Sequence, residues 1–173
     1  MRLHLSSPPF AYSPTRQNRG AVFIEEHMKT QITRKIEFDA GHRVLGHEGK
    51  CANIHGHRYV ALITVEGGLD NIGRVIDFSV VKEIVGKWID DNWDHNLLLH
   101  EKDPVAEFYE DMDYAKVQEF FGPKTPFLME CNPTAENMSA YLLKLANEIL
   151  PANITVTNVR IYETPNCWSD TSV

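Results

Sequence analysis

A chain of 173 residues is the size of one ordinary domain, and none of its apolar runs reaches the length of a membrane span. Its net charge of −7 argues against sequence-independent binding of nucleic acid, which depends on a surplus of Lys and Arg. Its three widely spaced cysteines argue against a disulfide framework and favour a reducing compartment. We therefore expect a soluble, cytoplasmic protein that binds neither nucleic acid nor membrane.

Residues 1–28 are predicted to be a disordered leader, and residues 29–173 a single domain. The leader contains the run SSPP, lacks hydrophobic periodicity and has no acidic residue before Glu25. Because arginines and serines accompany that absence, an organellar transit peptide is the alternative, although no amphipathic helix is evident. A true start at Met28 is the simpler explanation.

The first half of the domain predicts strands followed by a helix. Apolar and β-branched patterns predict strands over residues 30–42 and 57–67, and a short strand over residues 73–77. A helix follows, in which Val81, Val85 and Ile89 belong to the apolar stripe, with Asp77 or Ser79 as its cap.

The second half predicts one more helix and a final strand. The acidic stretch 101–119 is expected to be a solvated loop or a short helix. The next helix is capped by Asn132 or Thr134, and residues 154–164 form the last strand. This order contains no repeating βαβ unit, which predicts an α+β fold with an antiparallel sheet.

Residues 38–59, FDAGHRVLGHEGKCANIHGHRY, concentrate histidines between two predicted strands. Successive strand side chains point to opposite faces, so His55 and His57 project together and Gly56 keeps the position between them small. His42 ends the preceding strand and can meet them across the sheet. Three neutral imidazoles are a ligand set that leaves zinc an open coordination position.

Three interpretations fit this spacing. The histidines are polar groups on a sheet face, or they form a closed structural zinc site with Cys51, or they hold the metal alone and leave Cys51 as a reactive thiol. The number of histidines favours a metal. The spacing does not choose between the last two interpretations.

Two carboxylates, Asp94 and Glu163, lie at positions that suggest a functional role. Asp94 precedes His95, and a carboxylate can orient a histidine that exchanges protons if a turn brings the two side chains together. Glu163 falls on the apolar face of the last predicted strand, where a buried carboxylate needs a partner such as a ligand with N–H donors.

The motifs FDAGHR, KCANIHGHRY, GRVIDF, DHNLL, NPTAEN and YET follow one another between residues 29 and 164. Together they resemble the family of 6-pyruvoyltetrahydropterin and 6-carboxytetrahydropterin synthases. The resemblance implies the T-fold, a four-stranded antiparallel sheet with two helices on one face. It also implies a homohexamer, a dimer of trimers, whose sheets close into barrels and whose active sites lie between subunits.

The resemblance assigns a role to each candidate site residue. The implied ligands of Zn²⁺ are His42, His55 and His57. The implied catalytic residues are Cys51, with Asp94 and His95 contributed by a neighbouring subunit. The implied residues of the pterin pocket are Glu163, which anchors the ring, and Thr134 and Glu136 beside it.

The spacing of Cys51 and His55 is similar to that of the carboxy-forming branch. This branch converts 7,8-dihydroneopterin triphosphate into 6-carboxy-5,6,7,8-tetrahydropterin, acetaldehyde and triphosphate, on the route to queuosine and other 7-deazaguanines. The alternatives are the pyruvoyl-forming synthase of the biopterin route and a non-catalytic pterin-binding protein. The locally positive segment around Lys35, Arg43 and Lys50 would attract the triphosphate.

Overall fold

The computed structural model describes residues 29–173, and the predicted leader, residues 1–28, lies outside this part. The strands are β1 (Thr30–His42), β2 (His55–Gly67), β3 (Asn96–His100), β4 (Phe127–Met129), β5 (Ile154–Thr164) and β6 (Cys167–Ser172). The helices are α1 (Phe78–Val81), α2 (Lys87–Asn92), α3 (Pro104–Asp111), α4 (Tyr114–Phe121) and α5 (Ala135–Ile149). A π-helical turn, Lys82–Gly86, joins α1 to α2, and a 3-10 turn spans Lys50–Ala52. Across the described residues, each helix is too short or too polar to cross a bilayer.

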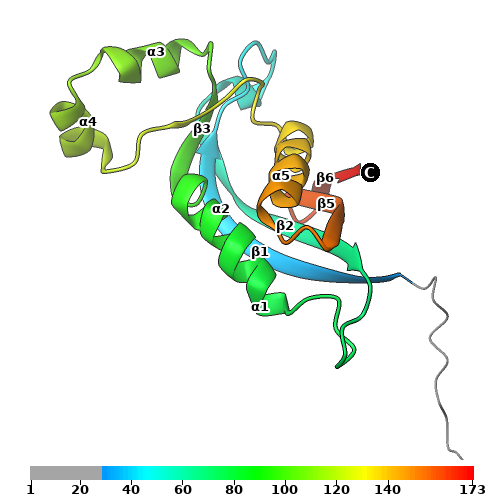
Figure 1. Ribbon diagram of the computed structural model, residues 1–173. Helices are drawn as coiled ribbons and strands as arrows, with labels where there is room; N and C mark the ends of the chain where they lie inside the picture. The colour runs from blue at the N-terminus through cyan, green and yellow to red at the C-terminus, as the bar shows by residue number, and fades with distance from the viewer. Residues whose placement is uncertain (1–28) are drawn as a thin grey trace, which may run out of the picture.

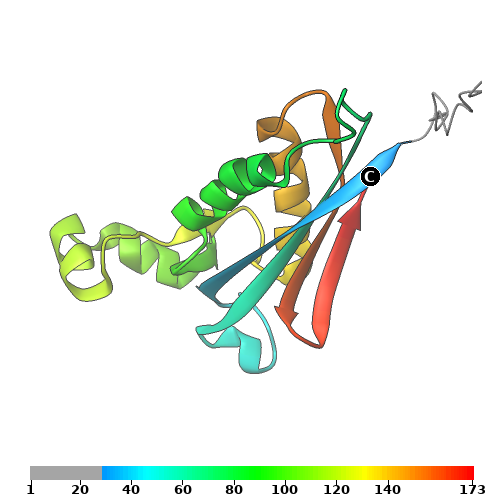
Figure 2. The same ribbon diagram turned by 90° about the horizontal axis from the view of Figure 1, so that it is seen from below.

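A strongly curved sheet carries α5 and the continuous α1–α2 helix on one face (Figures 1 and 2). The strand order is β4-β3-β1-β2-β5-β6. The pairs β1–β2, β2–β5 and β5–β6 are antiparallel, whereas β3 runs parallel to both β1 and β4. The α+β class and the two helices on one face agree with the prediction.

The sheet has six strands and not the expected four: β1, β2, β5 and β6 form an antiparallel run of four, and β3 and β4 add two parallel strands beyond β1. The leucines of β3 form a run too short to distinguish strand from helix by periodicity. β6 is polar and mostly exposed, so it has no apolar face to reveal it, and it is held by pairing with β5. The hydrophobic pattern therefore predicted neither β3 nor β6.

The predicted strand over residues 73–77 is also absent: residues 70–74 form a turn, and residues 75–77 lead into α1 without regular structure. The Asp70 carboxylate accepts hydrogen bonds from the backbone N–H groups of Ile72 (3.0 Å) and Arg74 (2.9 Å). Backbone donors satisfied by a side chain favour a turn over a sheet ladder. The cap at Asp77 is confirmed, since its side chain accepts from the Ser79 N–H at 2.8 Å.

The core lies between the sheet and the helices. On β1, Ile36, Phe38 and Ala40 face the helices and are buried, and alternation along the strand continues to His42, which is 1% exposed. Phe38 stacks on its cross-strand partner Tyr59 with ring centroids 5.2 Å apart. The pattern that builds the core therefore also turns His42 toward the helix-covered side.

The acidic stretch forms two short helices, α3 and α4, which extend away from the rest of the molecule (Figures 1 and 2). Asp103 begins this excursion as the cap of α3, accepting from the Val105 N–H at 2.9 Å. Its fully buried carboxylate also lies 3.1 Å from Nε of Arg43, the residue after His42. The excursion is thus joined to the end of β1.

Candidate active site

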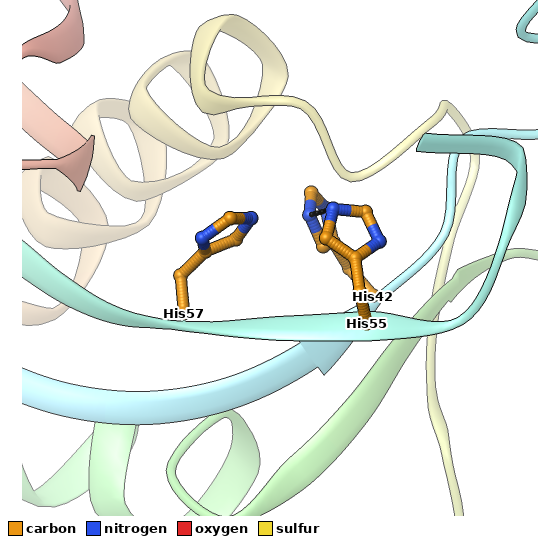
Figure 3. Close-up of side chains that lie close together, drawn as sticks. All are labelled: His42, His55 and His57. Atoms are coloured by element: carbon orange, nitrogen blue, oxygen red, sulfur yellow. Dashed lines mark hydrogen bonds between the residues drawn. The ribbon is translucent and has the colours of Figure 1, made fainter. Parts of the chain in front are cut away.

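Three imidazoles converge where β1 and β2 meet the segment before α5 (Figure 3). His42 and His55 are cross-strand partners, and His57 pairs with Ala40 two positions along the ladder. One ring nitrogen from each histidine lies within 4.8 Å of the other two. Among the described residues the group that meets in this way is His42, His55 and His57, and the Cys51 thiol is not part of it.

Backbone carbonyls select the tautomers of two of these rings. The Pro133 carbonyl lies 2.8 Å from Nδ1 of His42, and the Asn53 carbonyl lies 2.8 Å from Nδ1 of His55. A carbonyl only accepts, so each Nδ1 carries the proton and each Nε2 presents a lone pair. Such outer contacts commonly orient metal-binding histidines.

The free nitrogens face one another at a distance that suits a cation. Nε2 of His42 and Nε2 of His55 are 3.2 Å apart. Two nitrogens bound at the usual zinc distance with tetrahedral angles would be separated by about 3.3 Å. Nε2 of His57 is buried without a hydrogen-bond partner. A metal ion between the three rings would remove the repulsion between the lone pairs of His42 and His55 and would give the buried Nε2 of His57 a partner.

The protonation of these rings also favours a metal. Burial lowers the pKa of His42 and of His57 below the ordinary value of 6.5. Metals bind the neutral imidazole. Because burial disfavours the protonated ring, it favours the form that can act as a ligand. Oε1 of Glu163 lies 3.4 Å from Nε2 of His42 and 3.8 Å from Nε2 of His57, adding negative charge beside them.

Gly56 is required between the two histidines of β2. A Cβ atom at this position would lie 2.9 Å from the Ala40 carbonyl oxygen of the neighbouring strand. That contact is closer than a carbon and an oxygen tolerate, so any side chain would push β2 away from β1. The close approach of the two strands is what brings His42 to His55.

Cys51 lines a cavity of about 200 Å³ whose wall includes Glu163, the carboxylate beside His42 and His57. The pocket residues predicted from the sequence share this cavity: Thr134, Glu136 and Glu163. Thr134 also caps α5, accepting from the Asn137 N–H at 3.4 Å. A thiol, a carboxylate beside the histidines and the N-terminal turn of a helix therefore face one small space.

The loop that carries Cys51 is fixed at both ends. The Val44 N–H donates to the Cys51 carbonyl at 2.8 Å, which closes the loop on itself. The Asn132 side chain accepts from the Leu45 N–H at 2.8 Å and donates to the Leu45 carbonyl at 3.0 Å. Asn132 precedes Pro133, so one segment orients both the thiol loop and the His42 ring.

Asp94 and His95 form a hydrogen-bonded pair, with Oδ2 of Asp94 2.7 Å from Nδ1 of His95. The turn that the sequence analysis required to bring the two side chains together is present, because His95 adopts a left-handed backbone conformation with φ of 52°. Burial acts to raise the pKa of Asp94, but hydrogen bonds from the Asp39 N–H and His95, with the nearby Lys124 charge, outweigh it and lower this pKa. Asp94 is thus held as an anion.

The pair does not line the cavity that contains Cys51 in this chain. His95 borders two other hollows, one with Gly41, Gly56 and Leu97, the other with Tyr109 and Lys124. The His95 side chain is 76% exposed. The predicted catalytic residues therefore fall into two groups on one subunit.

The cavity also contains residues that sequence reasoning did not assign. His47 lines it from the Cys51 loop, and Cys167 and Trp168 line it from β6. His47 belongs to the histidine-rich segment, which was the signal available for it. No sequence pattern pointed to Cys167 and Trp168, because they reach the cavity only through the pairing of β6 with β5.

A family model described as 6-pyruvoyl tetrahydropterin synthase matches residues 31–172. The chain belongs to this family. A relative from Rickettsia felis, named 6-carboxy-5,6,7,8-tetrahydropterin synthase, is 44% identical over 80% of this chain and 96% of its own length. A relative from Halobacterium salinarum, named probable 6-carboxy-5,6,7,8-tetrahydropterin synthase, is 32% identical over 87% of this chain and 92% of its own length.

Solved structures share the fold of this chain. The 6-pyruvoyl tetrahydropterin synthase of Caenorhabditis elegans superposes with a TM-score of 0.58 at 24% identity, covering 84% of this chain and 96% of that one. An uncharacterized protein from Wolinella succinogenes superposes with a TM-score of 0.68 at 22% identity, covering 84% of this chain and 98% of that one. The predicted T-fold is confirmed: β1, β2, β5 and β6 are its antiparallel strands, and β3 and β4 extend the sheet beyond β1.

Proposed function

We propose that this family member is a zinc-dependent 6-carboxy-5,6,7,8-tetrahydropterin synthase of the route to queuosine and other 7-deazaguanines. It would convert 7,8-dihydroneopterin triphosphate, releasing acetaldehyde and triphosphate. The observation that carries the proposal is the convergence of three histidines, two of them with tautomers set by backbone carbonyls, near a cavity that the free Cys51 thiol lines. The names of the relatives with 43–44% identity support the carboxy-forming branch.

The proposed metal is Zn²⁺, held by His42, His55 and His57. Nitrogen ligands of this type suit zinc, and three protein ligands are typical of catalytic rather than structural zinc sites. When bound, zinc would supply a Lewis acid that polarises the substrate side-chain oxygens. Cys51 stays outside the group of ligand atoms, which favours the reactive thiol over the closed four-ligand site.

Cys51 would move a proton at the substrate side chain, because its thiol faces the cavity beside the three histidines. In this proposal Asp94 orients His95 and keeps Nδ1 protonated, so that Nε2 can accept or return a second proton. The two groups lie apart on one subunit, which supports a site completed by His95 from a neighbouring copy. A homohexamer would provide such sites.

Glu163 would anchor the pterin ring, since a carboxylate at the cavity wall can accept from ring N–H and amino groups. Thr134 and Glu136 would border the same ring. Of the three basic residues expected to attract triphosphate, Lys35 pairs with Glu37 and Arg43 with Asp103. In the described part of the chain no ion pair engages Lys50, beside Cys51, so Lys50 is the better candidate.

We further propose a cytoplasmic location. Cys51, Cys131 and Cys167 are all free thiols, as a reducing compartment would keep them.

The test is to incubate the zinc-loaded protein with 7,8-dihydroneopterin triphosphate, to identify the products by mass spectrometry and to assay acetaldehyde separately. Acetaldehyde with the carboxy-pterin supports the proposal. A pyruvoyl product without acetaldehyde would instead assign the chain to the biopterin branch. Bound zinc without turnover would indicate a non-catalytic pterin-binding protein.

A further inference from the structure

The backbone at the Asp94–His95 pair is held in an unusual conformation. His95 has a positive φ of 52°, a backbone conformation that residues other than glycine adopt at an energetic cost. The His95 N–H donates to the Asp39 carbonyl at 2.6 Å, and the Asp94 side chain accepts from the Asp39 N–H at 2.9 Å. Both contacts come from β1, on one side of the turn.

A third contact comes from a distant segment. Nζ of Lys124 donates to the Asp94 carbonyl at 2.6 Å and to the Asp90 carbonyl at 2.8 Å. Asp90 lies in the last turn of α2, where carbonyls lack helical partners and a cation is favoured. One ammonium group therefore joins the end of α2 to the residue before His95.

The position of Lys124 is itself restricted. It lies in the sequence GPKTP between α4 and β4, where Pro123 and Pro126 limit the backbone. Lys124, both prolines and His95 line a cavity of about 280 Å³. The return of the α3–α4 excursion to the sheet therefore brings a restrained cation to the histidine.

We propose that Lys124 is a positioning residue for His95 that fixes the left-handed turn orienting the imidazole. This inference rests on the proposed catalytic role of the Asp94–His95 pair. The α3–α4 excursion, which lies outside every motif that identified the family, would then serve to place Lys124 against the turn at Asp94 and His95. Lys124 acts through the backbone and does not itself contact substrate.

The variants Lys124→Met, Lys124→Arg and Lys116→Met test this inference in the full-length, zinc-loaded protein. Lys116 is an exposed residue of α4 and serves as the matched control. We expect Lys124→Met to lower kcat by about tenfold or more with KM changed less than about twofold, because misplacing a catalytic group slows chemistry more than binding. Lys124→Arg should recover part of the loss, since a guanidinium can also donate to two carbonyls.

A spectroscopic reading separates positioning from a general structural role. In ¹⁵N-histidine NMR spectra, the ring signals of His95 should shift in Lys124→Met and stay unchanged in Lys116→Met, with zinc content and Tm close to those of the parent protein. Unchanged kcat and His95 signals would overturn the inference. A loss of zinc or a large fall in Tm that accounts for the lost activity would overturn it as well.

A His95→Ala variant distinguishes this inference from the proposed function on which it rests. If His95→Ala loses turnover while Lys124→Met does not, only the role of Lys124 fails. If His95→Ala keeps full turnover, the proposed catalytic role of the pair fails first.

Discussion

Nε2 of His42 and Nε2 of His55 face each other across 3.2 Å while the Nδ1 atom of each ring is engaged by a backbone carbonyl. Two lone pairs at this distance repel unless a cation or a proton lies between them. Burial lowers the pKa of His42, so the proton is disfavoured. The fold therefore holds this pair in a form that could bind a metal ion.

Replacing His55 by Ala should reduce metal affinity by at least about 100-fold, because removal of a direct ligand costs more than removal of an outer partner. The parent protein should bind about one zinc per chain, and chelation should lower its Tm because the metal binds the folded form. Metal analysis and thermal unfolding measure both effects. His100→Ala, at the end of β3, is the control and should retain metal. Full zinc occupancy in His55→Ala would contradict the assigned site.

Replacing Cys51 by Ala should leave zinc content unchanged and lower turnover by about 10²-fold or more, since a positioned proton-transfer group contributes about this much. Cys131→Ala provides the control, because Cys131 packs against the core and lies outside the cavity. Metal analysis beside the product assay checks both parts. Loss of zinc in Cys51→Ala would show that the thiol is a ligand and that the site is closed.

Replacing Asn132 by Ala should loosen the loop that carries Cys51. Both backbone groups of Leu45 would lose their partner, at a cost of about 1–3 kcal/mol in the free energy of unfolding. Asn132→Asp keeps the acceptor and loses the donor, so its cost should be smaller. Urea unfolding gives the stability, and kcat should fall in the same order. Parent-like kcat in Asn132→Ala would show that the loop holds its position without this contact.

The anion at Asp94 predicts a dependence of stability on pH. The pKa of Asp94 is lower in the folded chain than the ordinary 3.8. Its contribution to the free energy of unfolding is therefore complete above pH 3.8 and is lost as the pH falls through the pKa of the folded state. The difference in Tm between the parent protein and Asp94→Asn should therefore be largest near neutral pH and shrink below pH 3.8. Thermal unfolding at a series of pH values measures it. A difference that grows toward acid would contradict the lowered pKa.

The sequence by itself determined the class of the fold and the set of candidate ligands. Alternation along β1 and β2 reports which side chains share a face, and this local rule brings His42, His55 and His57 to one side of the sheet. Helix caps such as Asp77 and Thr134 are also local, because a side chain meets backbone N–H groups two or three residues away.

Only the tertiary structure decided which distant residues meet. The six-stranded order depends on β3 and β6 finding partners, and neither carries a strong pattern of its own. Cys51 shares a cavity with Glu163 and Trp168, which β5 and β6 carry, and Lys124 contacts Asp94 where the chain returns from the α3–α4 excursion. The physical reason is that periodicity encodes the direction of a side chain along one element, whereas the contacts between elements depend on packing and strand pairing across the whole chain.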